Sequence, residues 1–331
     1  MIRIGIIGLG WWGKQIVACL AESPRFRVVA GCDVDHNMAA PFARDQNFDL
    51  VTDYKELLKR ADIDAIAVVT PHALHEEMAV AALAAGKQLF CEKPLSLTTA
   101  SAERILAASA KGGGVLGIGH ERRYEPAMED MRQLFESGAL GRILLMDANV
   151  SHNNFRKMDP SNWRRDPKHA PAGAWTALGI HLGDMMVSLA GPPTRVAART
   201  ASQIFPAPSE DYVSADIDFA GGARGRITCL STPPFYGRFT LIGDQGWVEV
   251  QEGGNVDKGI PSSFVHCGPD GSRTMREYGH TNTVRANFEA WADAVEGRAH
   301  YRFTTEQLLA NIRILDGVTR SAAADGKPVA T

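Results

Sequence analysis

The first 120 residues alternate between short apolar runs and segments in which apolar residues recur at helical spacing. The helical spacing is clearest after Pro71, where leucine, methionine and alanine side chains fall on one face. The apolar runs are continuous, which is typical of strands covered on both faces of a parallel sheet. They are Ile2–Ile7, Val28–Cys32, Ala65–Val69, Leu89–Cys91 and Val115–Ile118. We therefore predict an α/β domain in which a parallel sheet lies between two layers of helices.

Beyond residue 121 the pattern changes to strict alternation of apolar and polar positions. In Val213–Phe219 the apolar side chains share one face of a strand and the polar side chains share the other. Further strands of this kind are predicted at Arg226–Leu230, Phe239–Ile242 and Trp247–Val250. Such alternation indicates an antiparallel sheet with one packed face. Helices are predicted over Tyr124–Glu136, 284–295 and 308–315. We place the domain boundary near residue 121, which gives domains 1–121 and 122–331.

One glycine-rich segment, Gly8-Leu9-Gly10-Trp11-Trp12-Gly13, follows the first predicted strand and opens a predicted helix. In a dinucleotide-binding turn, the first glycine permits the tight turn, the second lets the backbone approach a pyrophosphate, and the third lets the helix pack on the strand. Free N–H groups at the helix start then receive the phosphates. The spacing and its strand–helix context therefore predict a dinucleotide site.

The second predicted strand ends at Asp33, twenty residues beyond the last glycine of this segment. A carboxylate at this place accepts hydrogen bonds from the ribose hydroxyls of adenosine and repels a 2′-phosphate. Val34 and Asp35 follow, so no arginine or lysine is at hand to pair with such a phosphate. The sequence therefore favours NAD over NADP.

Size, charge and cysteine content exclude several other classes of protein. The 331 residues carry a net charge of −3, and 45% of them are hydrophobic, which is ordinary for a globular chain of about two domains. This balance favours neither nucleic acid nor a membrane as a partner. The five cysteines show no C-x-x-C spacing, so we expect reduced thiols in a cytoplasmic enzyme and no metal site.

Further short motifs follow one another along the whole chain. They are Thr70-Pro71-His72 with His75, Glu92-Lys93-Pro94, the run G-H-E-R-R-Y-E-P over Gly119–Pro126, Asn162-Trp163-Arg164, the pattern G-x-H-x-x-D over Gly179–Asp184, and the tail Ser321–Val329. Together with the glycine turn, these motifs resemble the Gfo/Idh/MocA oxidoreductases, the family of glucose–fructose oxidoreductase and inositol dehydrogenase. The resemblance runs from residue 2 to about residue 329.

This resemblance implies a fold and an activity. The fold is an N-terminal Rossmann domain with a doubly wound parallel sheet, followed by a C-terminal α/β domain whose large, mainly antiparallel sheet mediates homodimers or homotetramers. The activity is hydride transfer between NAD or NADP and a carbinol of a sugar, cyclitol or related ring. The family motif places Lys93 beside the nicotinamide and the reacting hydroxyl, with the Lys93–Pro94 bond often cis, and makes His181 the proton acceptor.

The resemblance and the glycine turn together assign the remaining site residues. We expect cofactor contacts from Gly8, Leu9, Gly10, Trp11, Trp12, Gly13, Asp33, Thr70, Pro71, His72, His75, Glu92, Lys93, Pro94, Arg123, Trp163 and Arg164. We expect substrate contacts from Lys93, Glu121, Arg122, Trp163, His181 and Asp184. Hydride leaves a carbon only as its hydroxyl loses a proton, so the site needs a base such as histidine. A lysine beside it stabilises the developing alkoxide.

The segment around His181 adds a pattern and a departure. His181, Asp184 and Ser188 lie on a helix face away from the apolar stripe, so the histidine is not expected in a core. The family commonly has an Asp four residues before this His, and here that position is Ala177. Asp184 could orient His181 instead, the substrate could carry the missing polar group, or the protein could bind NAD without turnover.

Other features leave alternatives open. The basic segment from His152 to His169 could recognise a carboxylated or phosphorylated substrate, although such runs are more often solvated loops. It suggests a dehydrogenase of a cyclic dihydrodiol carboxylate as an alternative. Glu121 stands where the family often has Asn, and it could contact substrate hydroxyls or pair with a neighbouring arginine. Trp11 and Trp12 could wall the pyrophosphate or shape a subunit contact. A non-catalytic NAD-binding regulator is the alternative outside enzymes.

Overall fold

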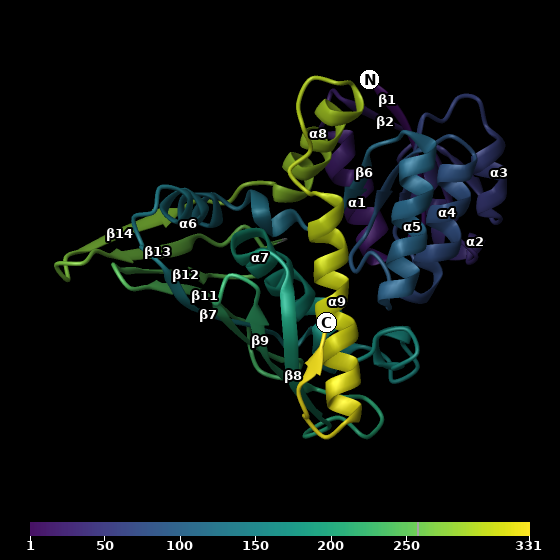
Figure 1. Ribbon diagram of the computed structural model, residues 1–331. Helices are drawn as coiled ribbons and strands as arrows, with labels where there is room; N and C mark the ends of the chain where they lie inside the picture. Colours follow the sequence, from purple (N-terminus) through teal and green to yellow (C-terminus); the bar gives the residue numbers. More distant parts are fainter. Residues whose placement is uncertain (257) are drawn as a thin grey trace. The chain divides into compact units, whose positions relative to one another are not determined.

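Six parallel strands form the first sheet in the order β3-β2-β1-β4-β5-β6. Figure 1 draws this part of the chain in purple and blue, with its helices labelled. The computed structural model describes residues 1–256 and 258–331. The strands are β1 (Ile2–Ile7), β2 (Phe26–Cys32), β3 (Asp49–Val51), β4 (Ala65–Val68), β5 (Gln88–Cys91) and β6 (Leu116–Ile118). The intervening helices are α1 (Trp11–Ala21), α2 (His36–Asp45), α3 (Tyr54–Lys59), α4 (His75–Ala84) and α5 (Thr99–Gly112). The strand order reverses between β1 and β4, where a doubly wound sheet binds ligands beyond the carboxyl ends of its strands.

The helices α2, α3 and α5 each begin at a residue whose side chain caps the first turn. Asp35 accepts the Met38 N–H at the start of α2, Asp53 accepts the Lys55 N–H at the start of α3, and Thr98 accepts the Ser101 N–H at the start of α5. These caps satisfy backbone donors that the first turn leaves unpaired. The parallel sheet and its covering helices confirm the fold class predicted for the N-terminal part.

The chain divides into two compact units. Unit 1 comprises Met1–Glu121 and Val284–Thr305, and unit 2 comprises Arg122–Thr283 and Glu306–Thr331. The segment 284–305 therefore lies with unit 1, apart from the rest of 122–331. Its helix α8 (Thr283–Val295) stacks Phe288 on Phe90 of β5, with ring centroids 3.8 Å apart, and the Trp291 indole donates to the Val115 carbonyl at 2.9 Å. Burial of these aromatic rings holds the segment on the parallel sheet.

Unit 2 contains a nine-stranded sheet in the order β14-β13-β12-β11-β7-β10-β9-β8-β15. All its pairs are antiparallel except β10 with β7, which confirms the large, mainly antiparallel sheet. Its strands are β7 (Ile143–Ser151), β8 (Pro193–Ala201), β9 (Tyr212–Phe219), β10 (Arg224–Leu230), β11 (Tyr236–Gly243), β12 (Trp247–Glu252), β13 (Ser262–Cys267), β14 (Arg273–Tyr278) and β15 (Val329–Ala330). Its helices are α6 (Pro126–Glu136), α7 (Ile180–Ala190) and α9 (Thr305–Ala323).

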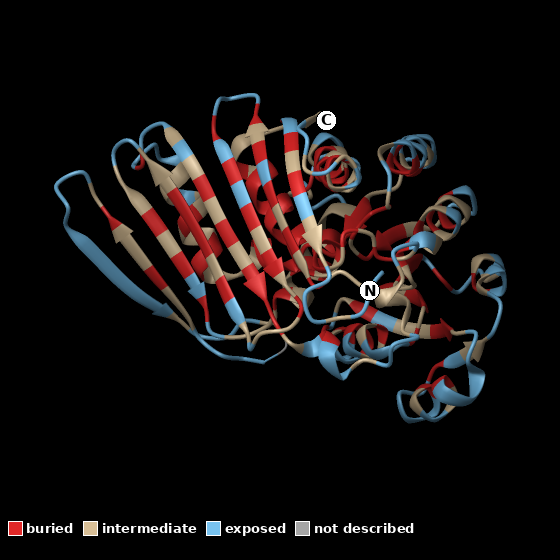
Figure 2. Cartoon of the chain, turned by 90° about the horizontal axis from the view of Figure 1, so that it is seen from below, coloured by how far each residue is buried: buried red, intermediate tan, exposed pale blue. Residues whose placement is uncertain are grey.

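The two faces of this sheet differ in chemistry. One face is covered by α6 over β12–β14, by α7 over β7 and β10, and by α9, whose Ser321 hydroxyl accepts the Ala198 N–H of β8. The other face carries cross-strand ion pairs, among them Arg195 with Asp218 and Arg226 with Asp216. Figure 2 shows the resulting alternation of buried and more exposed residues along the strands. None of the described helices has the length and apolar character that crossing a membrane requires.

Candidate active site

The glycine turn after β1 has the geometry that a pyrophosphate requires. Gly8 has a φ of +97°, and a Cβ at this position would lie 2.5 Å from the Val69 carbonyl oxygen. A Cβ at Gly13 would lie 2.0 Å from the Gly8 carbonyl oxygen, so α1 packs closely on the turn. A Cβ at Gly10 would meet nothing within 4 Å, which leaves its backbone open to a ligand. The three glycines therefore fit a dinucleotide in the manner that the spacing predicts.

Asp33 is fixed at the end of β2 by two backbone donors. One carboxylate oxygen accepts the Leu9 N–H at 2.7 Å and the other accepts the Asp35 N–H at 2.9 Å. These bonds join the glycine turn to the acidic residue, and each carboxylate oxygen keeps a lone pair for a further donor. Val34, between the two aspartates, is 90% exposed. The residues of this turn therefore suit ribose hydroxyls and supply no cation for a 2′-phosphate.

The Glu92-Lys93-Pro94 motif follows β5 and is held by a buried histidine. The Lys93–Pro94 peptide bond is cis, as the resemblance implies. His75 is fully buried, with one ring nitrogen 2.8 Å from the Pro94 carbonyl oxygen and the other 3.0 Å from that of Thr70. Burial lowers the pKa of His75. This ring thus ties the turn after β4 to the turn after β5, and its 0% exposure gives it no surface for a cofactor.

Glu92 and Glu121 form a buried carboxyl pair in the same unit. Glu92 is 6% exposed and Glu121 is 5% exposed. Gly119 lies directly after β6, and a Cβ at this position would lie 2.4 Å from a Glu92 carboxylate oxygen. The glycine therefore leaves room for the Glu92 side chain. Burial raises the pKa of Glu92 to about 7, the charge of Glu121 adds to this, and the charge of Lys93 opposes it. The carboxyl beside the proposed catalytic lysine therefore holds a proton more readily than an exposed glutamate.

In unit 2, His181 occupies the first turn of α7, directly after the π-helical turn η5 (Trp175–Gly179). His181 is 6% exposed and Asp184 is 1% exposed. The expectation that the polar face of this helix lies outside the core is wrong, because the sheet covers one side of α7 and α9 approaches the other. π-Helical turns inside α-helices are frequent at functional sites.

Two buried arginines of unit 2 are bound by carboxylates. Arg123 makes a bidentate pair with Asp184 through two contacts of 2.6 Å and donates to the Gln307 side chain at 2.9 Å. Arg122 pairs with Glu252 at the end of β12. The structure thus brings Arg123 and Asp184 together, and both guanidinium groups take part in the internal scaffold of this unit. A cofactor or substrate contact by either arginine stays a prediction.

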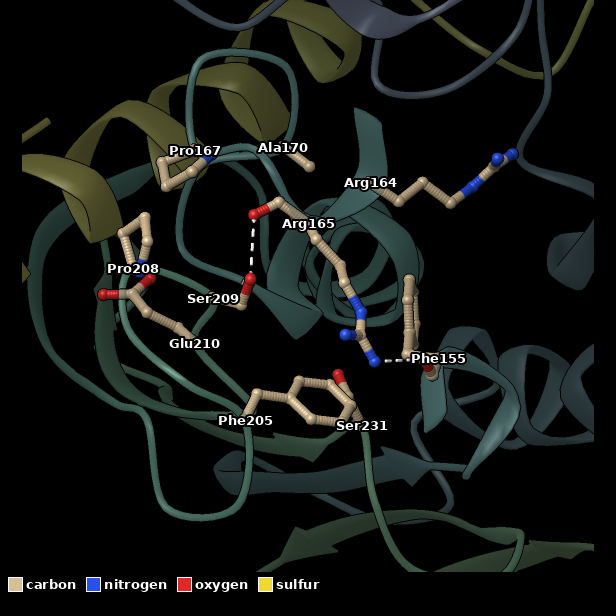
Figure 3. Close-up of a pocket in the computed structure, with 11 residues that line it drawn as sticks. Phe155, Arg164, Arg165, Pro167, Ala170, Phe205, Pro208, Ser209, Glu210 and Ser231 are labelled. Atoms are coloured by element: carbon tan, nitrogen blue, oxygen red, sulfur yellow. Dashed lines mark hydrogen bonds between the residues drawn. The ribbon is translucent and has the colours of Figure 1, made fainter. Parts of the chain in front are cut away.

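The basic segment between β7 and α7 is partly internal, as Figure 3 shows. Arg165 points toward Phe155 and Phe205: it donates to the Phe155 carbonyl at 2.8 Å, and its guanidinium lies 4.3 Å from the Phe205 ring centroid. Arg164 extends away from this pocket and stacks on Trp163 at 4.2 Å. The pocket has about 10 Å³ of space that water can occupy, room for one molecule, so Arg165 packs the interior of the loop. A ligand contact by Arg164 stays a prediction.

Four of the five cysteines are buried. No disulfide joins the cysteines among the described residues, and burial raises the pKa of Cys32 and of Cys229 to about 12. Within residues 1–256 and 258–331, no three His, Cys, Asp or Glu side chains are grouped so as to hold a metal ion.

The sequence prediction missed one residue of this region. Trp175 is fully buried and lies against Gly179 of the same turn. The sequence feature that could have identified Trp175 is its spacing from two glycines. Trp175, Gly179 and Gly183 recur every four residues and so fall on one side of a helix.

Comparisons with known proteins place the chain in a class. Residues 2–120 match the model of the oxidoreductase family with an NAD-binding Rossmann fold, and residues 128–249 match the model of the GFO/IDH/MocA C-terminal domain. The chain belongs to the Gfo/Idh/MocA family of oxidoreductases. It is therefore an oxidoreductase with an NAD-binding domain, which confirms the family, the enzyme class and the cofactor expected from the sequence.

Its relatives include several enzymes named for sugar or cyclitol substrates. The chain is 34% identical over 312 residues to inositol 2-dehydrogenase 1 of Saccharopolyspora erythraea, which covers 88% of this chain and 86% of that protein. It is 29% identical to 1,5-anhydro-D-fructose reductase of Ensifer adhaerens over 98% of this chain and 97% of that one. A solved structure of levoglucosan dehydrogenase with NADH and levoglucosan has a TM-score of 0.86 at 22% identity and covers 99% of both chains, a likeness of fold.

Proposed function

We propose that this protein transfers hydride between NAD and a carbinol of a polyhydroxylated ring, a sugar or cyclitol. The observation that carries the proposal is that one chain combines the oriented Asp33 carboxylate of an NAD turn with His181 at the start of a buried helix. Support for the substrate class comes from the relatives, whose names specify inositol and 1,5-anhydro-D-fructose.

In this proposal the glycine turn and Asp33 hold the cofactor, which supplies the acceptor or donor of the hydride when it is bound. As the carbinol C–H bond breaks, the proton of its hydroxyl passes to the His181 imidazole. Lys93 stabilises the negative charge that develops on the same oxygen. Trp163, Arg164, Glu121 and Asp184 complete the proposed site as binding or supporting groups.

We also propose that the open face of the nine-stranded sheet joins two copies of the chain, in a homodimer or homotetramer. The cross-strand pairs of Arg226 with Asp216 and Arg195 with Asp218 give this face charges of both signs. An isologous contact can match such a surface with its own copy. Five cysteines that form no disulfide among the described residues are typical of a reducing compartment, which supports a cytoplasmic location.

The test of the function is an assay of nicotinamide reduction or oxidation by absorbance. The purified protein is mixed with NAD and myo-inositol, levoglucosan or a cyclic dihydrodiol carboxylate, and with NADH and 1,5-anhydro-D-fructose. We expect turnover with a sugar or cyclitol, and its loss in Lys93→Ala. Turnover with the dihydrodiol carboxylate alone would overturn the substrate class. Binding of NAD without turnover of any substrate would favour the regulator.

A further inference from the structure

The N-terminal part of α7 packs against one aromatic ring, the indole of Trp175. This indole is fully buried. A Cβ at Gly179 would lie 2.9 Å from two carbons of this ring, closer than real Cβ contacts. Four residues further along, a Cβ at Gly183 would lie 3.8 Å from the same indole, which is ordinary contact. The helix that carries His181 can therefore approach the ring only because position 179 lacks a side chain.

Asn311 of α9 holds the same helix at a second point. Its side-chain amide donates to the Ile180 carbonyl at 3.1 Å, and a Cβ at Gly183 would lie 2.8 Å from its side-chain oxygen. Trp175 and Asn311 thus contact the residues on both sides of His181 in the sequence. Rotation of α7 about its axis would disturb one contact or the other.

The π-helical turn η5 determines the rotation of α7 about its axis, and so the direction in which the side chains of α7 point. A π-helical turn contains one residue more than an α-helical turn. Since an α-helix has 3.6 residues a turn, one residue more or less rotates everything that follows by about 100°. If residues 175–179 closed into an α-helical turn, the side chain of His181 would leave its present direction. A bulky ring inside the turn opposes this closure because it fills the space beneath Gly179.

We propose that Trp175 is a positioning residue that sets the orientation of His181 through the shape of its indole. The proposal rests on the proposed role of His181 as the base. The indole N–H is buried and has no hydrogen-bond partner among the described residues. An unpaired buried donor is costly, so shape, not a hydrogen bond, is what the tryptophan supplies. A phenylalanine, which keeps an aromatic ring without the donor, should then serve nearly as well.

The test changes the side-chain volume at positions 175 and 179, which are in contact. Gly179→Ala places a methyl group against the indole, Trp175→Leu removes the ring, and the double variant adds the methyl where the ring has gone. The environment of His181 is read from its imidazole resonances by NMR in the NAD-loaded protein, assigned by their absence from His181→Ala. Turnover is read in parallel with the substrate that the assay above identifies.

We expect Gly179→Ala to shift the His181 resonances and to lower kcat by about a hundredfold, the scale at which a misplacement of about 1 Å lowers a rate. Because the proposed binding groups Lys93, Glu121 and Trp163 lie outside α7, KM should change less. The double variant should return the resonances and kcat most of the way to wild type, and Trp175→Phe should remain close to wild type in both.

Gly183→Ala is the matched control, because its methyl group would clash with Asn311 at 2.8 Å but would make only ordinary contact with the indole at 3.8 Å. Trp175→Leu should therefore fail to rescue it. Rescue of both glycine variants by Trp175→Leu, or of neither, would overturn the proposal, since only a specific contact predicts one rescue. If His181→Ala retains turnover, the proposed base is wrong, whereas the resonances of His181 still report whether Trp175 positions it. Thermal unfolding identifies any variant that has merely lost its fold.

Discussion

The Asp33 carboxylate accepts the backbone N–H of Leu9 at 2.7 Å, so the residue proposed to bind the ribose also fixes the turn proposed to bind the phosphates. A substitution at Asp33 therefore acts on both halves of the nucleotide site. This coupling explains why a carboxylate at the end of β2 contributes to the shape of the site as well as to its charge.

The first prediction concerns cofactor preference. The wild-type protein should bind NAD more tightly than NADP, because a 2′-phosphate would lie against an unpaired carboxylate. Asp33→Ser with Val34→Arg should relax or invert this preference and weaken NAD through loss of the Leu9 contact. Calorimetric titration with both nucleotides measures it. Asp35→Ser, which can still cap α2, is the control and should keep the preference. Tighter binding of NADP to the wild type would contradict the interpretation.

The second prediction concerns the buried pair of Arg123 and Asp184. Asp184→Asn leaves the guanidinium buried without its countercharge, so the free energy of unfolding should fall by about 3–5 kcal/mol. Glu22→Gln is the control: its pair with Arg285 in unit 1 is exposed, so the loss should be about 0–1 kcal/mol. Denaturant unfolding of both variants gives the comparison. Equal losses of unfolding free energy in the two variants would show that the buried pair contributes no more to stability than the exposed pair.

The third prediction concerns pH. Burial and the Glu121 charge raise the pKa of Glu92 to about 7, above its unfolded value of about 4.3. The folded protein thus holds a proton that the unfolded chain releases, and stability falls as pH rises between these values. Glu121→Gln removes one cause, so its unfolding temperature relative to wild type should be higher at pH 8 than at pH 5.

The exposed Glu136, paired with Arg132 on α6, supplies the control for this measurement. Glu136→Gln should change the unfolding temperature by the same small amount at both pH values, because its side chain is exposed and lies in a surface ion pair, apart from Glu92. A pH-independent effect of Glu121→Gln would mean that the two buried carboxyl groups do not interact.

The sequence pattern predicted the elements whose residues are buried in a regular way, either continuously or in alternation. The continuous strands β1, β4 and β5 were predicted nearly to the residue because almost all their residues are buried, and β9 because its burial alternates. β14 was missed, since Arg273–Tyr278 is exposed along almost its whole length and carries no apolar pattern. The interpretation of α7 was wrong for a different reason. Its polar residues are buried by neighbouring elements, which no local sequence pattern reveals.

The site was predictable where a motif carries a steric requirement. Gly8 and Gly13 are needed wherever this turn forms, so their spacing alone identifies it. The partners of Arg123 and Glu92 come from residues 61 and 29 positions away, and only the fold brings them together. The helical stripe over 284–295 was correct as a helix, but its place on the parallel sheet depends on contacts with Phe26 and Phe90.

The fourth prediction concerns assembly. Sedimentation at micromolar concentration should show a species larger than the 35.8 kDa chain. Arg226→Glu places a like charge beside Asp216 on the open face of the sheet, and we expect it to shift the distribution toward the monomer. Lys111→Glu, at the end of α5 in unit 1, is the control and should leave the distribution unchanged. A wild type that sediments only as a monomer would rule out this assembly.

The last prediction concerns the base. If His181 accepts the substrate proton, His181→Ala should lower turnover by about two to four orders of magnitude, the usual scale of general base catalysis. NAD affinity should barely change, because the glycine turn and Asp33 belong to unit 1 and His181 to unit 2. Steady-state kinetics and a nucleotide titration separate the two effects. His300→Ala, at an exposed position of unit 1, is the control and should keep full turnover.

Ala177 provides a second test of the same assignment, because no carboxylate stands four residues before His181 to stabilise its protonated form. In Ala177→Asp such a carboxylate is restored, and the rise of turnover with pH should move to higher pH. Turnover itself can fall in this variant if a substrate group occupies the space, so the position of the pH profile is the decisive reading. Near-normal turnover in His181→Ala would instead make Lys93 the better candidate for the base.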